Sequence, residues 1–236
     1  MKFVDLTERD QNFRKMLDLR AYFYLDRMQP QVAAYIGSTA SGFLPVEGVA
    51  SLFIEVRPGM AINTLTDIAV KRSDVRPAMQ IVERQYGLLE IHSETMAEVA
   101  HAGTTILETL GLQENDRYRP HILSTHVITR VNDYHCQLVN RERRDSMLLA
   151  GQTLFILDVE PAAYAVLAAN EAEKFSETTL VEVRPFGASG RLYLGGTEAD
   201  IEAASSAVLH GLQFLDGREL VVRRSDSTEQ RIFLKP

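Results

Sequence analysis

The sequence repeats itself once, and this repeat limits the folds that the chain can adopt. Four residues of different chemical type recur at one spacing of 103 positions. The pairs are Arg27 and Arg130, Gly48 and Gly151, Pro58 and Pro161, and Lys71 and Lys174. One spacing held over four pairs indicates a tandem duplication. The 236 residues are therefore expected to fold as two similar domains of ordinary size.

A strand that ends in a glycine also occurs in both copies, at residues 81–87 and 180–187. Its last two residues are Tyr86-Gly87 in the first copy and Phe186-Gly187 in the second, which is a spacing of 100. The shorter spacing predicts about three extra residues in the first copy before this point. Because glycine adopts backbone conformations that other residues avoid, the glycine after Tyr86 predicts a sharp turn there.

Composition narrows the class of protein. The formal net charge is -7 and the pI is near 5.4, with 45% hydrophobic and 24% charged residues. These values indicate a soluble globular protein and argue against a nucleic-acid binder. The longest apolar run, at 162–169, is too short to span a membrane, and residues 1–10 lack the apolar core of a signal peptide. With Cys136 as its single cysteine, the chain is expected in the reducing cytoplasm.

Strands and helices alternate in both copies. Strands are expected at residues 19–27, 50–56, 75–83 and 88–92 in the first copy, and at 123–130, 153–159, 179–184 and 191–194 in the second. Helices are expected to follow Pro58, Pro161 and Thr197. A further helix follows Thr95, whose spacing to Glu98 is that of a capping box.

The segments between these elements set the expected domain limits. A flexible loop is expected at residues 37–42 and a polar linker at 113–120. The resulting division gives an N-terminal extension, two domains and a C-terminal tail that can form a hairpin. Their limits are 1–19, 20–116, 117–215 and 216–236. The pattern of residues leaves the two extensions without an assigned role.

At this point the residues resemble a known family. Residues 51–58 (SLFIEVRP) and 162–174 (AAYAVLAANEAEK) look like bacterial microcompartment shell domains. Supporting segments occur in both copies, at 28–31, 42–45, 82–84, 139–141 and 187–192. From about 20 to 215 the chain resembles the tandem-domain, trimer-forming shell proteins. Among these it is most similar to the circularly permuted, gated-pore type of carboxysomes and related compartments.

The resemblance implies an α+β fold of two tandem circularly permuted shell domains, each a four-stranded antiparallel sheet with packed helices. It also implies a homotrimer, in which six domains form a pseudohexagonal tile around one central pore. Trimers of this type also stack face to face, and other microcompartment shell proteins would be neighbours in the shell. The family supplies no catalytic residue, metal ligand or cofactor site to transfer to this sequence.

Glu83 and Arg84 match the pore-gate pair of the family. Around a threefold axis they would place three carboxylates and three guanidiniums on one narrow ring. Exposed ion pairs contribute about 0.2–1 kcal/mol each, so three pairs would favour a closed pore by roughly 1–3 kcal/mol. A ligand can reverse a preference of this size. The alternative is an ordinary surface ion pair.

The resemblance assigns two further sets of residues. The pore-lining turns comprise Gln85, Tyr86, Gly87, Phe186, Gly187, Ala188 and Ser189, and the tile edge comprises Lys71, Lys174, Arg27 and Arg130. The second turn lacks a Glu-Arg pair; its backbone N–H groups would suit anions, or it is a plain hairpin turn. A lysine at the end of a helix also suits the helix dipole without any role at an edge.

Other sites are not supported by their spacing. His121, His126, His135 and Cys136 fit no metal-binding pattern. Residues 37–42 lack the Lys-Ser/Thr of a phosphate loop, and Gly187-Ala-Ser-Gly lacks the last glycine of a nucleophile elbow. Residues 141–144 favour a solvated loop over an anion site. Neither catalytic residues nor metals nor cofactors are therefore expected.

The expected function is that of a structural shell protein whose trimer forms a gated pore for polar or anionic metabolites. It needs no nucleic acid and no membrane. A small-molecule-binding regulatory protein of ferredoxin-like α+β type is the alternative, and it would show saturable ligand binding without sheet assembly. An enzyme is the third class, but no nucleophile with a base and no cofactor fingerprint supports it.

Overall fold

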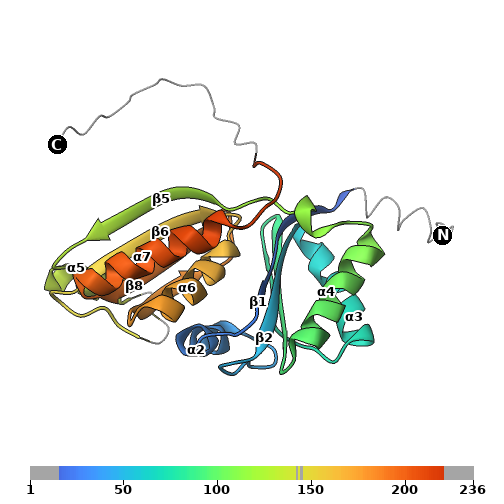
Figure 1. Ribbon diagram of the computed structural model, residues 1–236, viewed down its shortest axis with the longest axis horizontal. Helices are drawn as coiled ribbons and strands as arrows, with labels where there is room; N and C mark the ends of the chain where they lie inside the picture. Colours follow the sequence, from blue (N-terminus) through green and yellow to red (C-terminus); the bar gives the residue numbers. More distant parts are fainter. Residues whose placement is uncertain (1–15, 142, 144–145, 221–236) are drawn as a thin grey trace, which may run out of the picture.

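The computed structural model describes residues 16–141, 143 and 146–220 (Figure 1). Most of the predicted N-terminal extension and the predicted C-terminal hairpin lie outside these residues. Part of the predicted loop at 141–145 lies outside them as well.

Each half of the chain forms one four-stranded antiparallel sheet, which confirms the predicted fold class. The first sheet has the strand order β1-β2-β4-β3 and the second the order β5-β6-β8-β7. The strands are β1 (Asp18–Leu25), β2 (Ala50–Arg57), β3 (Arg76–Glu83), β4 (Tyr86–Ser93), β5 (His121–Ile128), β6 (Thr153–Glu160), β7 (Thr179–Arg184) and β8 (Gly190–Gly196). The limits of the two domains, 20–116 and 117–215, stay a prediction.

Helices cover one face of each sheet (Figure 1). On the first sheet these are α3 (Ile62–Arg72) and α4 (Met96–Leu110), and on the second α6 (Tyr164–Phe175) and α7 (Glu198–Gln213). Shorter elements are η1 (Gly59–Ala61) and η2 (Glu114–Asp116). Gly111, in the left-handed conformation at φ 69°, ends α4, because glycine carries no Cβ to oppose it.

Two helices were not predicted. The expected loop at 37–42 is wrong as far as Thr39, because α2 (Pro30–Thr39) occupies it; the second is α5 (Asp133–Val139). Glycine, serine and threonine in α2 have weak helix propensity, and Val32 and Ile36 are fully buried. Tertiary packing has therefore overridden local propensity.

The two copies stay in register at 103 positions through the glycine that was predicted to form a turn. Val56 pairs with Gly87 across β2 and β4, and Val159 pairs with Gly190 across β6 and β8. Gly87 therefore corresponds to Gly190 and not to Gly187. The predicted spacing of 100 is wrong, and so is the predicted insertion of three residues.

The sharp turn predicted at Gly87 is also wrong, because β3 and β4 are joined by Arg84 and Gln85. Gly87 lies inside β4, where an added Cβ would be 2.2 Å from the carbonyl oxygen of Gly59. At Gly190 an added Cβ would be 2.1 Å from the carbonyl oxygen of Ala162. Both glycines are required by the close approach of another backbone segment.

The predicted capping box of α4 is half correct. The Thr95 side chain accepts a hydrogen bond from the backbone N–H of Glu98. The Glu98 carboxylate accepts instead from the backbone N–H of Asp74, at 3.0 Å. Glu98 therefore ties the loop before β3 to the start of α4. A reciprocal capping box does occur in the second copy, between Thr197 and Asp200.

The second face of the first sheet is covered by α2 and by the second half of the chain. Figure 1 shows β1 near the centre of the molecule and β5 along an outer margin, with α2 between the halves. Ala21, Phe23 and Leu25 of β1 are fully buried, and the Phe23 ring lies 5.5 Å from the ring of Tyr164 in α6. A continuous apolar cluster therefore joins the two halves.

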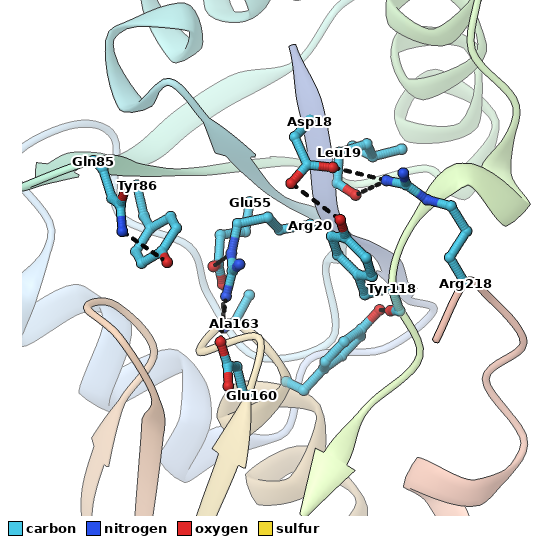
Figure 2. A network of polar contacts seen from close by, with 11 residues as sticks. Asp18, Leu19, Arg20, Glu55, Gln85, Tyr86, Tyr118, Glu160, Ala163 and Arg218 are labelled. Atoms are coloured by element: carbon cyan, nitrogen blue, oxygen red, sulfur yellow. Dashed lines mark hydrogen bonds and ion pairs between the residues drawn. The ribbon is translucent and has the colours of Figure 1, made fainter. Parts of the chain in front are cut away.

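A charged network lies inside the same contact (Figure 2). Arg20 of β1 donates through Nε to Oε1 of Glu55, at 2.6 Å, and through Nη2 to Oε1 of Glu160, at 3.2 Å. The second oxygen of Glu55 accepts from the backbone N–H of Ala163, at 2.9 Å. Burial raises the pKa of Glu55, and the Arg20 guanidinium opposes this by favouring the carboxylate. The network joins β1 and β2 to the second half.

Gly87→Ala is predicted to lower the free energy of unfolding by about 1–3 kcal/mol, because the backbone at Gly59 must move to admit the added Cβ. Urea unfolding followed by circular dichroism measures this change. Gly37→Ala is the matched control, since no atom lies within 4 Å of an added Cβ inside α2 and alanine favours helix by about 0.5–1 kcal/mol. Equal midpoints for the two variants would contradict the close-approach explanation.

Candidate functional site

Two turns from the two halves of the chain lie against each other. One joins β3 to β4 through Arg84 and Gln85, and the other joins β7 to β8 through residues 185–189. An added Cβ on Gly187, at φ 106°, would lie 3.5 Å from Oε1 of Glu83. The structure thus brings together the two turns that the resemblance assigned to a pore.

The partner of Glu83 differs from the one expected. Glu83 Oε1 lies 3.9 Å from Nη2 of Arg184, a residue of the other half. Arg84 is exposed, with a positive φ of 55°, and no ion pair with Glu83 is formed. Because both side chains of the Glu83–Arg184 pair are partly solvated, the pair contributes at most about 1 kcal/mol.

Arg184 is a site residue that sequence reasoning missed. Its guanidinium lies 5.4 Å from the centre of the Phe186 ring, within the range of a cation–π contact. A basic residue directly before Pro185 at the end of a strand was the available signal. Each chain therefore supplies one carboxylate and two guanidiniums to the adjoining turns, which gives them a net positive charge.

The first turn is tied to the contact between the halves (Figure 2). Gln85 Nε2 donates to the hydroxyl of Tyr86 at 2.9 Å, and the Arg20 guanidinium lies 4.0 Å from the centre of the Tyr86 ring. Gly87 is buried inside β4, whereas Ala188 is exposed in the second loop. Ser189, next to Ala188, is partly buried. Tyr86 therefore links the first turn to the contact between the two halves.

The four predicted edge residues lie in different surroundings. Lys71 is 69% exposed and binds Asp67 at 2.7 Å. Lys174 is 27% exposed and binds Glu171 at 2.8 Å and Asp26 at 3.4 Å. Burial lowers the pKa of Lys174, but these two carboxylates outweigh burial and the pKa lies above its usual value. The two lysines are equivalent in sequence and not in contacts.

Arg27 and Arg130 are exposed. Arg27 shares a pocket of about 370 Å³ with Lys174 and Glu47, at the contact between α2 and the second half. Arg130 has a positive φ of 48°. The structure therefore brings Arg27 close to Lys174 and does not bring all four residues to one place.

No cluster of three or more histidine, cysteine or acidic side chains suited to a metal occurs within residues 16–220 as far as the structure describes them. Cys136 is buried there, and burial raises the pKa of its thiol. None of the described helices is long and apolar enough to cross a membrane.

Comparison with known proteins gives consistent similarities. The family of CsoS1D N-terminal domains matches residues 19–116. The carboxysome shell protein CcmP of Synechococcus elongatus is 50% identical over 203 residues, which cover 86% of this chain and 95% of that protein. The carboxysome shell protein CsoS1D of Hydrogenovibrio crunogenus is 47% identical over 204 residues, which cover 86% and 100% of the two chains.

Solved structures with the same fold are similarly related. A fused permuted hexameric shell protein of the RMM microcompartment is 41% identical, with a TM-score of 0.82. A double-ringed trimeric shell protein of that microcompartment is 38% identical, with a TM-score of 0.83. Both comparisons cover 86% of this chain and 100% of the other, so the similarity includes both sheets.

Lys174→Ala is predicted to lower stability more than Lys71→Ala. Lys71 makes an exposed i,i+4 pair worth about 0.2–0.5 kcal/mol, whereas Lys174 is partly buried between two carboxylates that would remain close together without it. Midpoints of urea unfolding for the two single variants measure the difference. A larger loss for Lys71→Ala would contradict this interpretation of the contacts.

Proposed function

This chain belongs to the tandem-domain shell proteins of bacterial microcompartments, of the carboxysome type, and from that premise we propose that three copies form a pseudohexagonal tile with a gated central pore. Its role as a structural shell component follows from the family. The trimer, the gate and the passage of polar or anionic metabolites are the proposal, together with the absence of a catalytic role.

Equivalent residues of the two copies differ in burial, and this difference is the observation that supports a closed ring of three chains. Phe23 of β1 is fully buried against the second half, and its counterpart at 103 positions, His126 of β5, is exposed. Ala21 is buried too, whereas its counterpart Ser124 is only partly buried. One sheet is therefore covered by the chain itself, and the same face of the other sheet lacks this cover.

The two helices that lie beside these faces repeat the mismatch. In α2, Tyr35 is buried in the apolar cluster that joins the two halves. Its counterpart in α5, Leu138, is 61% exposed, and Tyr134 of the same helix is 79% exposed. Large exposed apolar side chains on one face are typical of a protein interface. By analogy with the internal contact, this face of the second sheet would be covered by a first half. The first half of the same chain cannot do so, because it lies on the opposite side of the second half.

A second copy can supply the missing cover. Within the chain, η1 and α3 of the first half are the counterparts of the segment that covers β1. η1 and α3 present Met60 and Val70, which are exposed apolar side chains. If each second half receives the first half of the next copy in the geometry of the internal contact, the copies assemble head to tail, as a closed ring or as an open filament according to the rotation between the halves. The solved relatives of this fold, named as a hexameric and a double-ringed trimeric shell protein, support a closed ring of three chains over an open filament.

The ring would place the adjoining turns of each chain on its axis. Three copies then contribute Glu83, Arg84 and Arg184 to one narrow passage, with more guanidiniums than carboxylates. A net positive constriction favours anions over cations. This charge is what supports polar or anionic metabolites as the molecules that pass.

The tile-edge role of Lys71, Lys174, Arg27 and Arg130 is a further part of the proposal. Lys71 suits a contact with a neighbouring tile, because its only ion pair in the described structure is exposed. Lys174 would have to give up two carboxylates first. Contacts with other shell proteins are therefore assigned first to Lys71.

Glu83→Ala and Arg84→Ala are predicted to raise the fraction of trimers with an open pore while the trimers stay intact. Glu83→Ala removes the Glu83–Arg184 pair from each of the three chains, and Arg84→Ala removes the pair that Arg84 would form around the ring with Glu83 of the partner subunit. At about 0.2–1 kcal/mol for each pair, either loss shifts the ratio of open to closed pores by up to roughly a hundredfold, since 1.4 kcal/mol is a factor of ten. Classification of single particles by electron cryomicroscopy measures this ratio.

Glu198→Ala is the matched control, since it removes an exposed carboxylate of α7 that makes no ion pair with the described residues. It should leave the ratio unchanged. Loss of the trimer in both gate variants, or an unchanged ratio in both, would contradict the assignment of the gate.

A further inference from the structure

The contact within the chain and the proposed contact between copies differ in their charged residues. Within the chain, the Arg20 guanidinium lies between the carboxylates of Glu55 and Glu160. Glu55, Arg20 and Glu160 are replaced at 103 positions by Asp158, Leu123 and Arg57. The cation therefore lies on the opposite side of the contact. At the internal contact it is Arg20 of the sheet that is covered, and at the proposed contact it is Arg57 of the half that covers.

Asp158 lacks the partners that its counterpart Glu55 has. Its side chain is half-buried, and Oδ1 is buried without a hydrogen-bond partner in the structure. A carboxylate oxygen that is removed from water and left unpaired is costly. In the first copy, Arg20 and the backbone N–H of Ala163 remove this cost.

Arg57 has no partner either. It is the last residue of β2, is exposed, and its side chain forms no ion pair or hydrogen bond with the part of the chain that the structure describes. In the proposed ring, Arg57 of one copy takes the position that Glu160 has at the internal contact. It would therefore face the Asp158 carboxylate of the next copy.

The lengths of the side chains fit this exchange. Aspartate is one methylene shorter than glutamate, so Asp158 reaches less far across the seam than Glu55. Arginine is longer than glutamate, so Arg57 reaches further than Glu160. Leu123, in place of Arg20, is exposed and apolar, and Met60 takes the position of Ala163 with its backbone N–H. A carboxylate, a cation and an N–H donor are thus present again.

Arg191 is the other candidate partner for Asp158. It lies directly opposite Asp158 in the register of β6 and β8. No ion pair between them is formed, and Arg191 is exposed. Asp158 thus has a basic residue opposite it within its own chain but forms no ion pair with it.

We propose that Asp158 forms an ion pair with Arg57 of the partner subunit at each seam between copies. This inference rests on the proposed trimer and names the residues that close it. Half of the seams in the tile are then held by an arginine of the same chain and half by an arginine of the next chain. Assembly then gives Asp158 a cationic partner, which it does not contact among the described residues of its own chain.

The test uses the full chain in sedimentation velocity over a range of concentrations. Asp158→Arg and Arg57→Asp each place like charges at all three seams, and each is expected to raise the concentration for half-dissociation of the trimer at least about tenfold. The combination of both substitutions is expected to restore most of the trimer. Asp158→Asn, which keeps the shape of the side chain, should give a smaller loss.

The control variant is Arg191→Ala, which should leave assembly unchanged, and circular dichroism confirms that each dissociated variant is folded. Trimers of unchanged affinity in both single variants would overturn the ion pair and leave the trimer standing. Losses that the double variant does not restore, or an equal loss in Arg191→Ala, would overturn it as well. An unaltered chain that does not form trimers would overturn the proposed function itself.

Discussion

The structure depends on the buried guanidinium of Arg20 between the two halves of the chain. Charges removed from water are costly unless they are fully paired, and loss of one partner of a buried pair costs about 3–5 kcal/mol. The partners of Arg20 come from both halves, since Glu55 belongs to β2 and Glu160 to β6. The network therefore fixes how the second sheet lies against the first. It also holds Tyr86, next to the turn that meets Gly187.

The internal contact also explains why one chain is incomplete. Each copy of a duplicated domain carries one surface that is covered and one that covers. Within a single chain, only one covered surface can meet one covering surface, so one surface of each kind is left over. Phe23 is buried in the pair that is joined, whereas Leu123, Leu138 and Met60 lie on the surfaces that are left over. The equivalent positions of the other copy are buried, where Arg20, Tyr35 and Ala163 occupy them. The proposed ring would bury all of them, because cyclic symmetry repeats one contact geometry around the axis.

The sequence predicted what local and repeated patterns encode. Apolar strands, the prolines at 58 and 161, and the spacing of 103 were sufficient for the order of strands and helices along the chain, whereas their arrangement as two four-stranded antiparallel sheets was predicted from the resemblance to the shell family. It did not predict α2 and α5, whose helical state depends on packing. A glycine required by a close approach looks the same in sequence as a turn glycine, so Gly87 was misinterpreted. The contact of Glu83 with Arg184 joins residues 101 positions apart, and only the contact between the halves brings them together.

The central claim is that three chains close one ring, and the mass of the unaltered protein in solution tests it most directly. Light scattering at physiological salt should give about 80 kDa, three times the chain mass of 26.5 kDa. Twice that mass would indicate two stacked trimers and would agree with the ring. A monomer would contradict it, because the exposed face of the second sheet would stay uncovered, and a dimer would contradict it, because the ring requires three chains.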